Sequence, residues 1–100
     1  MANITIKIPH NKTQEEAISC VKNLLDNVKE KYSKEITNLK EEWDSHECTF
    51  SFKTKGYELS GTLIVGKMEV ILDAKVPWAL TFFKSKIERR IREEAQHCLI

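Results

Sequence analysis

Six histidine and cysteine side chains are the first candidates for chemistry in this sequence. They stand at His10, Cys20, His46, Cys48, His97 and Cys98. Zinc sites usually show paired Cys-x-x-Cys or His-x-x-x-His spacing, and neither pattern occurs. A Cys/His pair could also act as a nucleophile with its base, but no oxyanion loop or third orienting group accompanies one here. The three glycines are isolated and form no phosphate-binding loop. From the lack of these three kinds of motif we expect no metal, no cofactor and no catalytic residue.

Glu41 is a carboxylate that strand alternation places on an inward face, between Leu39 and Trp43. An inward carboxylate could have a raised pKa and act as a general acid or base. An inward charge on an outer strand also protects a sheet from edge-to-edge aggregation, and no second carboxylate is placed to act with Glu41. We favour the protective role. If the domain is instead a small apolar-ligand binder or a weak enzyme, Glu41, Trp43 and Tyr57 are the expected pocket lining.

The aromatic pair Trp78 and Phe82 lies on the side of a predicted helix opposite its core position Leu80. Each ring can bury roughly 150–250 Å² in a contact. If both rings face outward, they form a surface for another subunit, an apolar ligand or a lipid-like surface. If the helix start tucks under residues 74–77, both rings are buried within the monomer. Trp78 and Phe82, with Arg89 farther along the helix, are our candidates for an interaction surface, and a homodimer is its first expected form.

The charged residues nearly balance, with 16 Lys and Arg against 15 Asp and Glu. This total gives no general electrostatic reason to bind nucleic acid or an anionic membrane. The layout is uneven, however: residues 35–55 hold three basic and five acidic side chains, whereas residues 76–100 hold five basic and three acidic ones. All the arginines lie at 89–92 among glutamates at i,i+4 spacing, which is typical of a solvated helix face. We expect no nucleic-acid partner.

The apolar periodicity defines the elements that must position these residues. Alternation at the start of the chain predicts a short strand over residues 3–8. Thr13 and Glu16 form a capping-box pattern, so a helix with one apolar face is expected over about residues 14–33. From 36 to 75 the apolar period becomes two, which is typical of antiparallel strands with one covered face and one wet face.

Two glycine-containing turns, at 55–56 and 66–67, set the expected registers of three of these strands. The pairs that two-residue turns would produce are Phe50 with Gly61, Phe52 with Leu59, Val65 with Met68, and Leu63 with Val70. Both hairpins then place apolar side chains opposite one another, and an aromatic ring covers the strand glycine.

Pro77 suits the first position of a second helix, because its missing amide is harmless there. The core positions expected on this helix are Leu80, Phe83, Ile87, Ile91, Ala95 and Cys98. The element order is then β-α-β-β-β-β-α. We expect residues 1–100 to form a single α+β domain, a two-layer sandwich of an antiparallel sheet of four to five strands with two helices packed on one face.

Several sequence features favour the cytoplasm. No apolar stretch approaches the roughly 18 residues that a membrane helix needs, so no transmembrane segment is expected. Residues 1–5 lack the basic start and apolar core of a signal peptide. Three cysteines are an odd number without framework spacing, which predicts reduced thiols.

The most distinctive block is residues 76–94, Val-Pro-Trp-Ala-Leu-x-x-Phe-Lys-x-Lys-Ile-Glu-x-x-Ile-Arg-x-Glu. With residues 4–10 (Ile-x-Ile-x-Ile-Pro-His) and the glycine-punctuated strands at 57–74, it resembles a small bacterial family over nearly the whole chain. That family is the polyhydroxyalkanoic acid system proteins, also called the polyhydroxyalkanoate granule-region family. It is named for proximity to storage genes and not for an activity, so the resemblance carries over no catalytic residue. We expect a non-enzymatic interaction or surface-associating protein, whose partner is a granule surface, an apolar ligand or a second copy.

Overall fold

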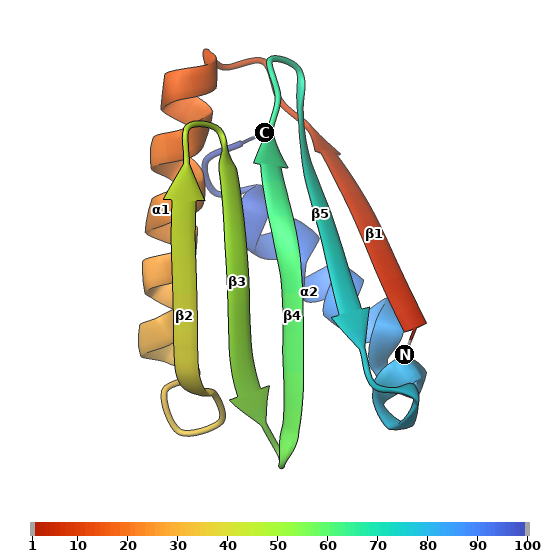
Figure 1. The fold of residues 1–100 in the computed structure, drawn as a ribbon. Coiled ribbons are helices and arrows are strands. Elements are labelled where there is room, and N and C mark those ends of the chain that lie inside the picture. Colours follow the sequence, from red (N-terminus) through yellow and green to blue (C-terminus); the bar gives the residue numbers. More distant parts are fainter. Residues whose placement is uncertain (1, 100) are drawn as a thin grey trace.

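A five-stranded antiparallel sheet carries both helices on one face (Figure 1), in a computed structural model that describes residues 2–99. The strands lie side by side in the order β1-β5-β4-β3-β2. Along the chain the elements are β1 (Ala2–Pro9), α1 (Gln14–Lys31), β2 (Thr37–Asp44), β3 (Glu47–Thr54), β4 (Tyr57–Val65), β5 (Glu69–Val76), the 3₁₀ helix η1 (Trp78–Phe83) and α2 (Lys84–Ala95). The predicted α+β fold and its element order are confirmed.

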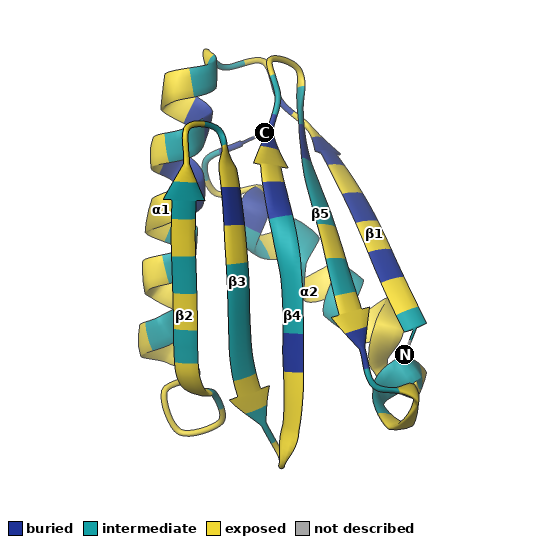
Figure 2. Cartoon of the chain, in the orientation of Figure 1, coloured by how far each residue is buried: buried dark blue, intermediate teal, exposed yellow. Residues whose placement is uncertain are grey.

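The covered face of the sheet is apolar and the opposite face is polar. On β1 every second side chain from Ile4 to Ile8 is buried, and Figure 2 shows this alternation along the strand. The buried apolar residues of the domain are Ile4, Ile6, Ile8, Ala17, Cys20, Val21, Cys48, Leu59, Leu63, Val65, Val70, Val76, Ala95 and Leu99. Removing these side chains from water is the main favourable contribution to folding.

The capping box at the start of α1 forms as predicted. The Thr13 hydroxyl accepts a hydrogen bond from the Glu16 N–H at 3.1 Å, and the Glu16 carboxylate accepts one from the Thr13 N–H at 3.0 Å. The helix ends at Lys31, two residues earlier than predicted. At this end the Tyr32 N–H donates to the Val28 carbonyl at 2.9 Å, which completes the last helical hydrogen bond.

The β3–β4 hairpin has the predicted register. Phe50 pairs with Gly61, and the next predicted pair along the strands is also present. The turn residues Lys55 and Gly56 have φ angles of 51° and 80°. Positive φ at both central residues is what a two-residue turn with the twist of its strands requires.

The predicted β4–β5 register is wrong by two residues. The structure pairs Val65 with Val70 and Leu63 with Leu72, whereas a two-residue turn would put Met68 opposite Val65. The shift is an even number of residues, so the same side chains stay on the covered face. The apolar pattern therefore survives a wrong turn length.

His10 explains the longer β4–β5 connection. Its backbone N–H donates to the Met68 carbonyl at 2.9 Å, and its ring Nε2 donates to the Gly66 carbonyl at 2.9 Å while Nδ1 accepts from the Lys12 N–H. The Gly66 N–H donates in turn to the Glu69 carbonyl at 2.8 Å. The end of β1 thus fixes the loop in a wider shape than a local turn preference would give.

Pro77 precedes a helix, but this helix does not begin as an α-helix. The residues after it form η1, and α2 begins only at Lys84. Phe83, predicted in the core, has 46% of its surface exposed. It is the junction between the two helix types, with φ −94° and ψ 4°, so a single α-helical wheel does not give its direction. The other predicted core positions are buried or half-buried: Leu80, Ile87, Ile91, Ala95 and Cys98.

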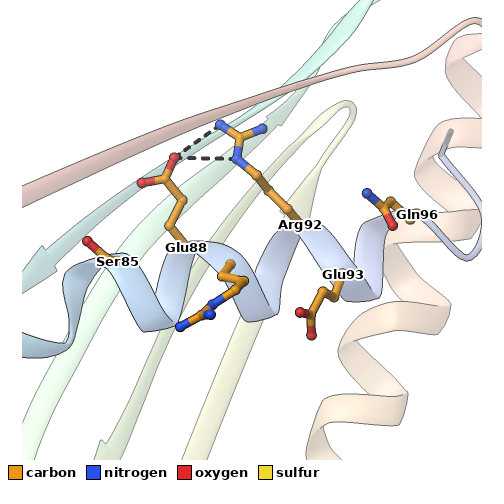
Figure 3. A pocket seen from close by; sticks show the side chains of 6 residues that line it. Ser85, Glu88, Arg92, Glu93 and Gln96 are labelled. Carbon is orange, nitrogen blue, oxygen red and sulfur yellow. Dashed lines mark hydrogen bonds and ion pairs between the residues drawn. The ribbon is translucent and has the colours of Figure 1, made fainter.

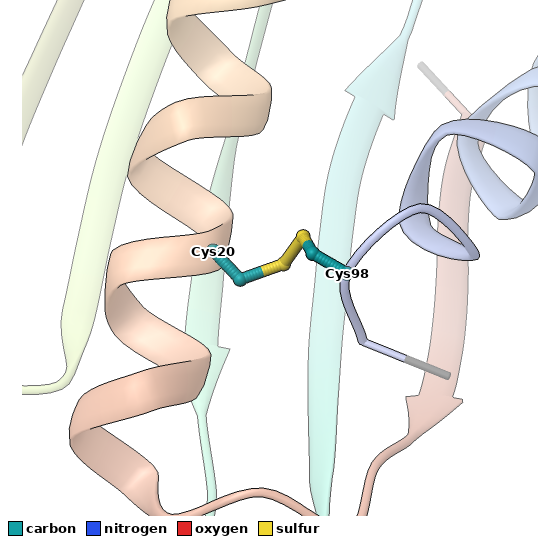
Figure 4. The surroundings of a disulfide bond; sticks show 2 residues. All are labelled: Cys20 and Cys98. Carbon is teal, nitrogen blue, oxygen red and sulfur yellow. A yellow bond between two sulfur atoms is a disulfide. The ribbon is translucent and has the colours of Figure 1, made fainter.

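The expectation of three reduced thiols is wrong for two of them. Cys20 of α1 and Cys98, beyond the end of α2, form a disulfide bond with their Cα atoms 5.9 Å apart (Figure 4). They are 78 residues apart in the sequence, so no local spacing indicates the pairing. Cys48 on β3 is a free, buried thiol.

Among residues 2–99, no helix combines the length and the apolar character needed to cross a bilayer.

Gly61→Ala should destabilise the fold. A Cβ at this position would lie 2.8 Å from Phe50 Cζ and closer still to the Asp73 carbonyl oxygen, so the strands would have to move. We expect a loss of about 3 kcal/mol in the free energy of unfolding, measured by urea denaturation. Gly66→Ala is the matched control, since its nearest new contact is the Glu69 carbonyl oxygen at 3.0 Å. Equal losses in the two variants would contradict the close packing at Gly61.

Cys98→Ser should also lower the free energy of unfolding. Cross-links that close long loops typically contribute about 2–4 kcal/mol. Dithiothreitol should lower the urea midpoint of the wild type and of Cys48→Ala, which keeps the disulfide, but should leave the midpoint of Cys98→Ser unchanged. A wild-type midpoint that does not respond to dithiothreitol would contradict the bond.

Candidate functional site

The start of the C-terminal helical segment presents three exposed aromatic side chains. Trp78 has 68% of its surface exposed, Phe82 92% and Phe83 46%. All three belong to η1, and together they are called the aromatic surface below. The predicted pair Trp78 and Phe82 therefore faces outward, and the alternative in which residues 74–77 cover both rings is not found.

Contacts with the core and within the backbone hold η1 at the end of β5. Val76 is buried at the end of that strand, and Leu80 packs against the core. The Leu80 N–H donates to the Pro77 carbonyl at 2.9 Å, and the Thr81 hydroxyl donates to the Trp78 carbonyl at 2.7 Å. The exposed rings therefore project from a backbone that these contacts hold against the domain.

The β3–β4 turn lies next to the aromatic surface. The Lys55 Nζ is 5.7 Å from the ring centroid of Phe83, which is within cation–π distance. Tyr57, at the start of β4, is also exposed. Sequence reasoning missed Phe83 because the helix type changes there. It missed Lys55 because local spacing does not encode a contact between distant elements.

The charged residues of the segment around η1 are all lysines. Between Asp73 and Glu88 the chain holds Lys75, Lys84 and Lys86 and no carboxylate. All three lysines are exposed. The aromatic surface therefore belongs to a locally cationic part of a nearly neutral chain.

Arg89, the third residue predicted in the interaction surface, is exposed within α2. It lines a shallow hollow of about 350 Å³ (Figure 3). The hollow is lined by Ser85, Glu88, Arg89, Arg92, Glu93 and Gln96. The Arg92 guanidinium donates to Glu88 at 3.2 and 3.4 Å and to the Lys7 carbonyl at 3.1 Å. With two carboxylates in the hollow, Arg89 does not form a basic site of its own.

Glu41 points inward and is paired. Its Oε1 lies 2.5 Å from the Lys29 Nζ of α1, and its Oε2 accepts a hydrogen bond from Trp43 Nε1 at 3.2 Å. The hydrogen bond with Glu41 raises the pKa of Lys29. On the neighbouring strand, burial and then the charge of Glu41 raise the pKa of the Cys48 thiol. The carboxylate therefore bridges β2 and α1, and the Lys22 Nζ over the Trp43 ring, 5.1 Å from its centroid, adds a second contact.

The three residues named as a pocket lining lie in two places. Glu41 and Trp43 are hydrogen-bonded to each other, but Tyr57 lies at the opposite end of the sheet. Tyr57 pairs with Thr54 beside the β3–β4 turn, whereas Trp43 pairs with Cys48 close to the β2–β3 turn. A second shallow hollow, of about 480 Å³, is lined by Asn27, Glu30, Lys31, Glu94 and His97. Neither hollow includes the three predicted residues.

The remaining candidates for metal or nucleophile chemistry are dispersed. His10 holds the β4–β5 loop, His46 lies 3.1 Å from the Ser45 hydroxyl, and His97 lines the second hollow. Over residues 2–99, no three His, Cys, Asp or Glu side chains are grouped so that they could hold a metal ion.

Comparison with known protein families assigns the chain to one of them. The family model of the polyhydroxyalkanoic acid system proteins matches residues 4–99. The chain belongs to this family. Searches among curated proteins and among solved structures returned no match.

Membership confirms the family resemblance seen in residues 76–94. The matched part of this polyhydroxyalkanoic acid system protein runs from β1 to beyond the end of α2 and contains the whole aromatic surface. The family description links the chain to polyhydroxyalkanoate systems and specifies neither an activity nor a site residue. Any role for individual residues therefore has to be argued from their geometry.

Glu41→Gln should weaken the bridge between α1 and β2. The amide cannot form the ion pair with Lys29, so we expect a loss of about 0.5–1 kcal/mol in the free energy of unfolding at pH 7. Because the pair raises the pKa of Lys29, its contribution is complete below the ordinary lysine pKa of 10.5 and is lost as the pH rises through the higher folded-state pKa. The stability difference between wild type and variant should therefore disappear in alkaline solution.

Urea denaturation over a series of pH values measures this difference. Glu42→Gln is the matched control, because Glu42 is exposed on the opposite face of the same strand. If both variants lose the same free energy, the effect is one of net charge and the bridge makes no contribution.

Proposed function

We propose that this protein is a non-enzymatic surface-associating protein of the bacterial cytoplasm that attaches to polyhydroxyalkanoate storage granules through Trp78 and Phe82. The observation that carries the proposal is the exposure of these two rings, 68% and 92%, on a backbone anchored to the core. The family supplies the setting, since its description names polyhydroxyalkanoic acid systems.

The size of the exposed apolar area supports attachment to a surface. Covering both rings would remove roughly 300 Å² from water, and burial contributes about 25 cal/mol per Å². Part of that gain is offset by the freedom that the protein loses on binding. The binding free energy that remains suits reversible attachment of many copies of the protein to one large apolar surface.

The alternatives of a pocket or an enzyme find less support. Glu41 is already engaged by Lys29 and Trp43, which favours a role in the fold over one in proton transfer. Tyr57 lies at the other end of the sheet from these residues. The two hollows described above are shallow, and their linings come from α2 and from the facing sides of α1 and the C-terminal segment.

Replacing both rings, in Trp78→Ala/Phe82→Ala, should abolish attachment without unfolding the domain. We expect retention on polyester particles to fall about tenfold or more, because the apolar contact area is lost. The urea midpoint should stay within error of the wild type, since neither ring belongs to the core cluster. Co-sedimentation of the protein with the particles measures retention.

A matched control removes exposed apolar side chains from another part of the molecule. Ile64→Ala/Met68→Ala changes two exposed residues at the β4–β5 end and should keep wild-type retention. Undiminished retention of Trp78→Ala/Phe82→Ala would contradict the proposal. A wild type that ignores the particles but sediments as a dimer, with the aromatic variant monomeric, would show that the rings serve self-association instead.

A further inference from the structure

Lysines flank the aromatic surface from two parts of the chain. Lys75, Lys84 and Lys86 come from the segment that contains η1, and Lys55 reaches the Phe83 ring from the β3–β4 turn. All four lysines are exposed. No carboxylate lies between positions 74 and 87, and over positions 53–58 the single carboxylate, Glu58, stands against Lys53 and Lys55.

The opposite end of the molecule has the opposite charge balance. Figure 1 places η1 and the β3–β4 turn at one end, and the start of α1 with the β2–β3 and β4–β5 turns at the other. The longest dimension is 37 Å, so the two ends are well separated. The charged side chains beside those far turns and the α1 start are Glu15, Glu16, Asp44, Glu47 and Glu69, against Lys12, Lys22 and Lys67. The near-zero net charge therefore conceals a polarised molecule.

We propose that the aromatic surface docks on an anionic phospholipid layer, with its rings among the lipids and its lysines at the phosphates. This inference deepens the surface association proposed above and rests on it, because it names the chemistry of the surface. The contact would be made end-on, by η1 and the β3–β4 turn together.

Each type of side chain at this end suits such a layer. Tryptophan and phenylalanine rings enter the boundary between headgroups and acyl chains, where apolar area is buried at little cost to the backbone. Lysine stems lie along apolar surface while their ammonium groups reach the phosphates. A lysine close to an anionic leaflet strengthens binding by about fivefold. The Lys55 Nζ, 5.7 Å from the Phe83 ring, already combines the two types in one contact.

Charge favours an anionic layer over two other occupants of this surface. In a symmetric dimer the same patch meets itself, so the lysines of one copy would face those of the other. Like charges brought together in this way oppose association. An uncharged polyester would cover the rings, as in the attachment proposed above, but the four ammonium groups would add nothing to the binding. An anionic layer satisfies both the rings and the lysines.

The test compares vesicles that differ only in charge. One set is phosphatidylcholine alone, and the other contains about one third phosphatidylglycerol, which gives an anionic surface. We expect the full-length protein to bind the anionic vesicles and to be released by high salt, because salt screens the lysine contacts. Vesicle co-sedimentation measures both effects.

Charge-reversal variants assign the effect to these lysines. Lys84→Glu/Lys86→Glu should weaken binding to anionic vesicles by about 30-fold or more, since two contacts are lost and replaced by repulsion. Lys12→Glu/Lys67→Glu has the same net charge but changes lysines beside the α1 start and the β4–β5 turn, at the opposite end of the molecule, so it should bind much more strongly than the first variant. Circular dichroism confirms that both variants are folded.

The outcomes separate this inference from the function on which it rests. Binding to neutral vesicles or to polyester particles that equals binding to anionic vesicles, with no response to salt, would overturn the inference and leave the surface association standing. Equal losses in the two charge-reversal variants would also overturn it, since net charge alone would then explain the binding. Failure to bind any of these surfaces would contradict the surface association itself.

Discussion

The covered face of the sheet has to be shared between two helices of unequal length, and most other features follow from that constraint. Figure 1 shows α1 running along the β2 edge of the sheet, while α2 crosses the face behind the strands on the other side. α1 has 18 residues and α2 only 12. The segment before α2 is η1, which lies where β5 ends and has only Leu80 packed on the core. The rings of η1 are thus exposed because η1 lies where the layer formed by the two helices ends.

The contacts that attach α2 to α1 and to the core are concentrated at the C-terminal end of α2. Ala95 and Leu99 are buried there, Glu94 is 2.9 Å from Lys31 of α1, and the disulfide of Cys98 follows. Ala95 and Leu99 lie on either side of Cys98 in the sequence, so apolar packing and the disulfide hold the same part of the chain. The bond therefore adds to an attachment that apolar packing also makes. The aromatic surface of η1 lies at the other end of α2, away from these contacts.

The elements that sequence predicts well are those set by local physics. The capping box of Thr13 and the positive φ values of the β3–β4 turn need only neighbouring residues, and both form as predicted. The predictions fail where a distant residue decides the outcome. His10 reaches across from β1 to set the β4–β5 loop, and Cys20 meets a partner 78 residues away. Periodicity gives the face of a side chain but not the partner that meets it.

The candidate site also has a part that local sequence predicts and a part that depends on distant residues. The sequence identifies Trp78 and Phe82 as a pair opposite Leu80, because that relation is internal to one helical segment. It leaves open whether another segment covers them, and it gives no sign that Lys55 joins them from a hairpin turn. Charge composition has the same weakness, because a total of 16 positive and 15 negative residues does not show how the fold separates them in space. Antiparallel pairing brings the β3–β4 turn and the end of β5 to the same end of the sheet, so lysines far apart in sequence gather beside the exposed rings. A nearly neutral chain can in this way present one end suited to an anionic apolar boundary.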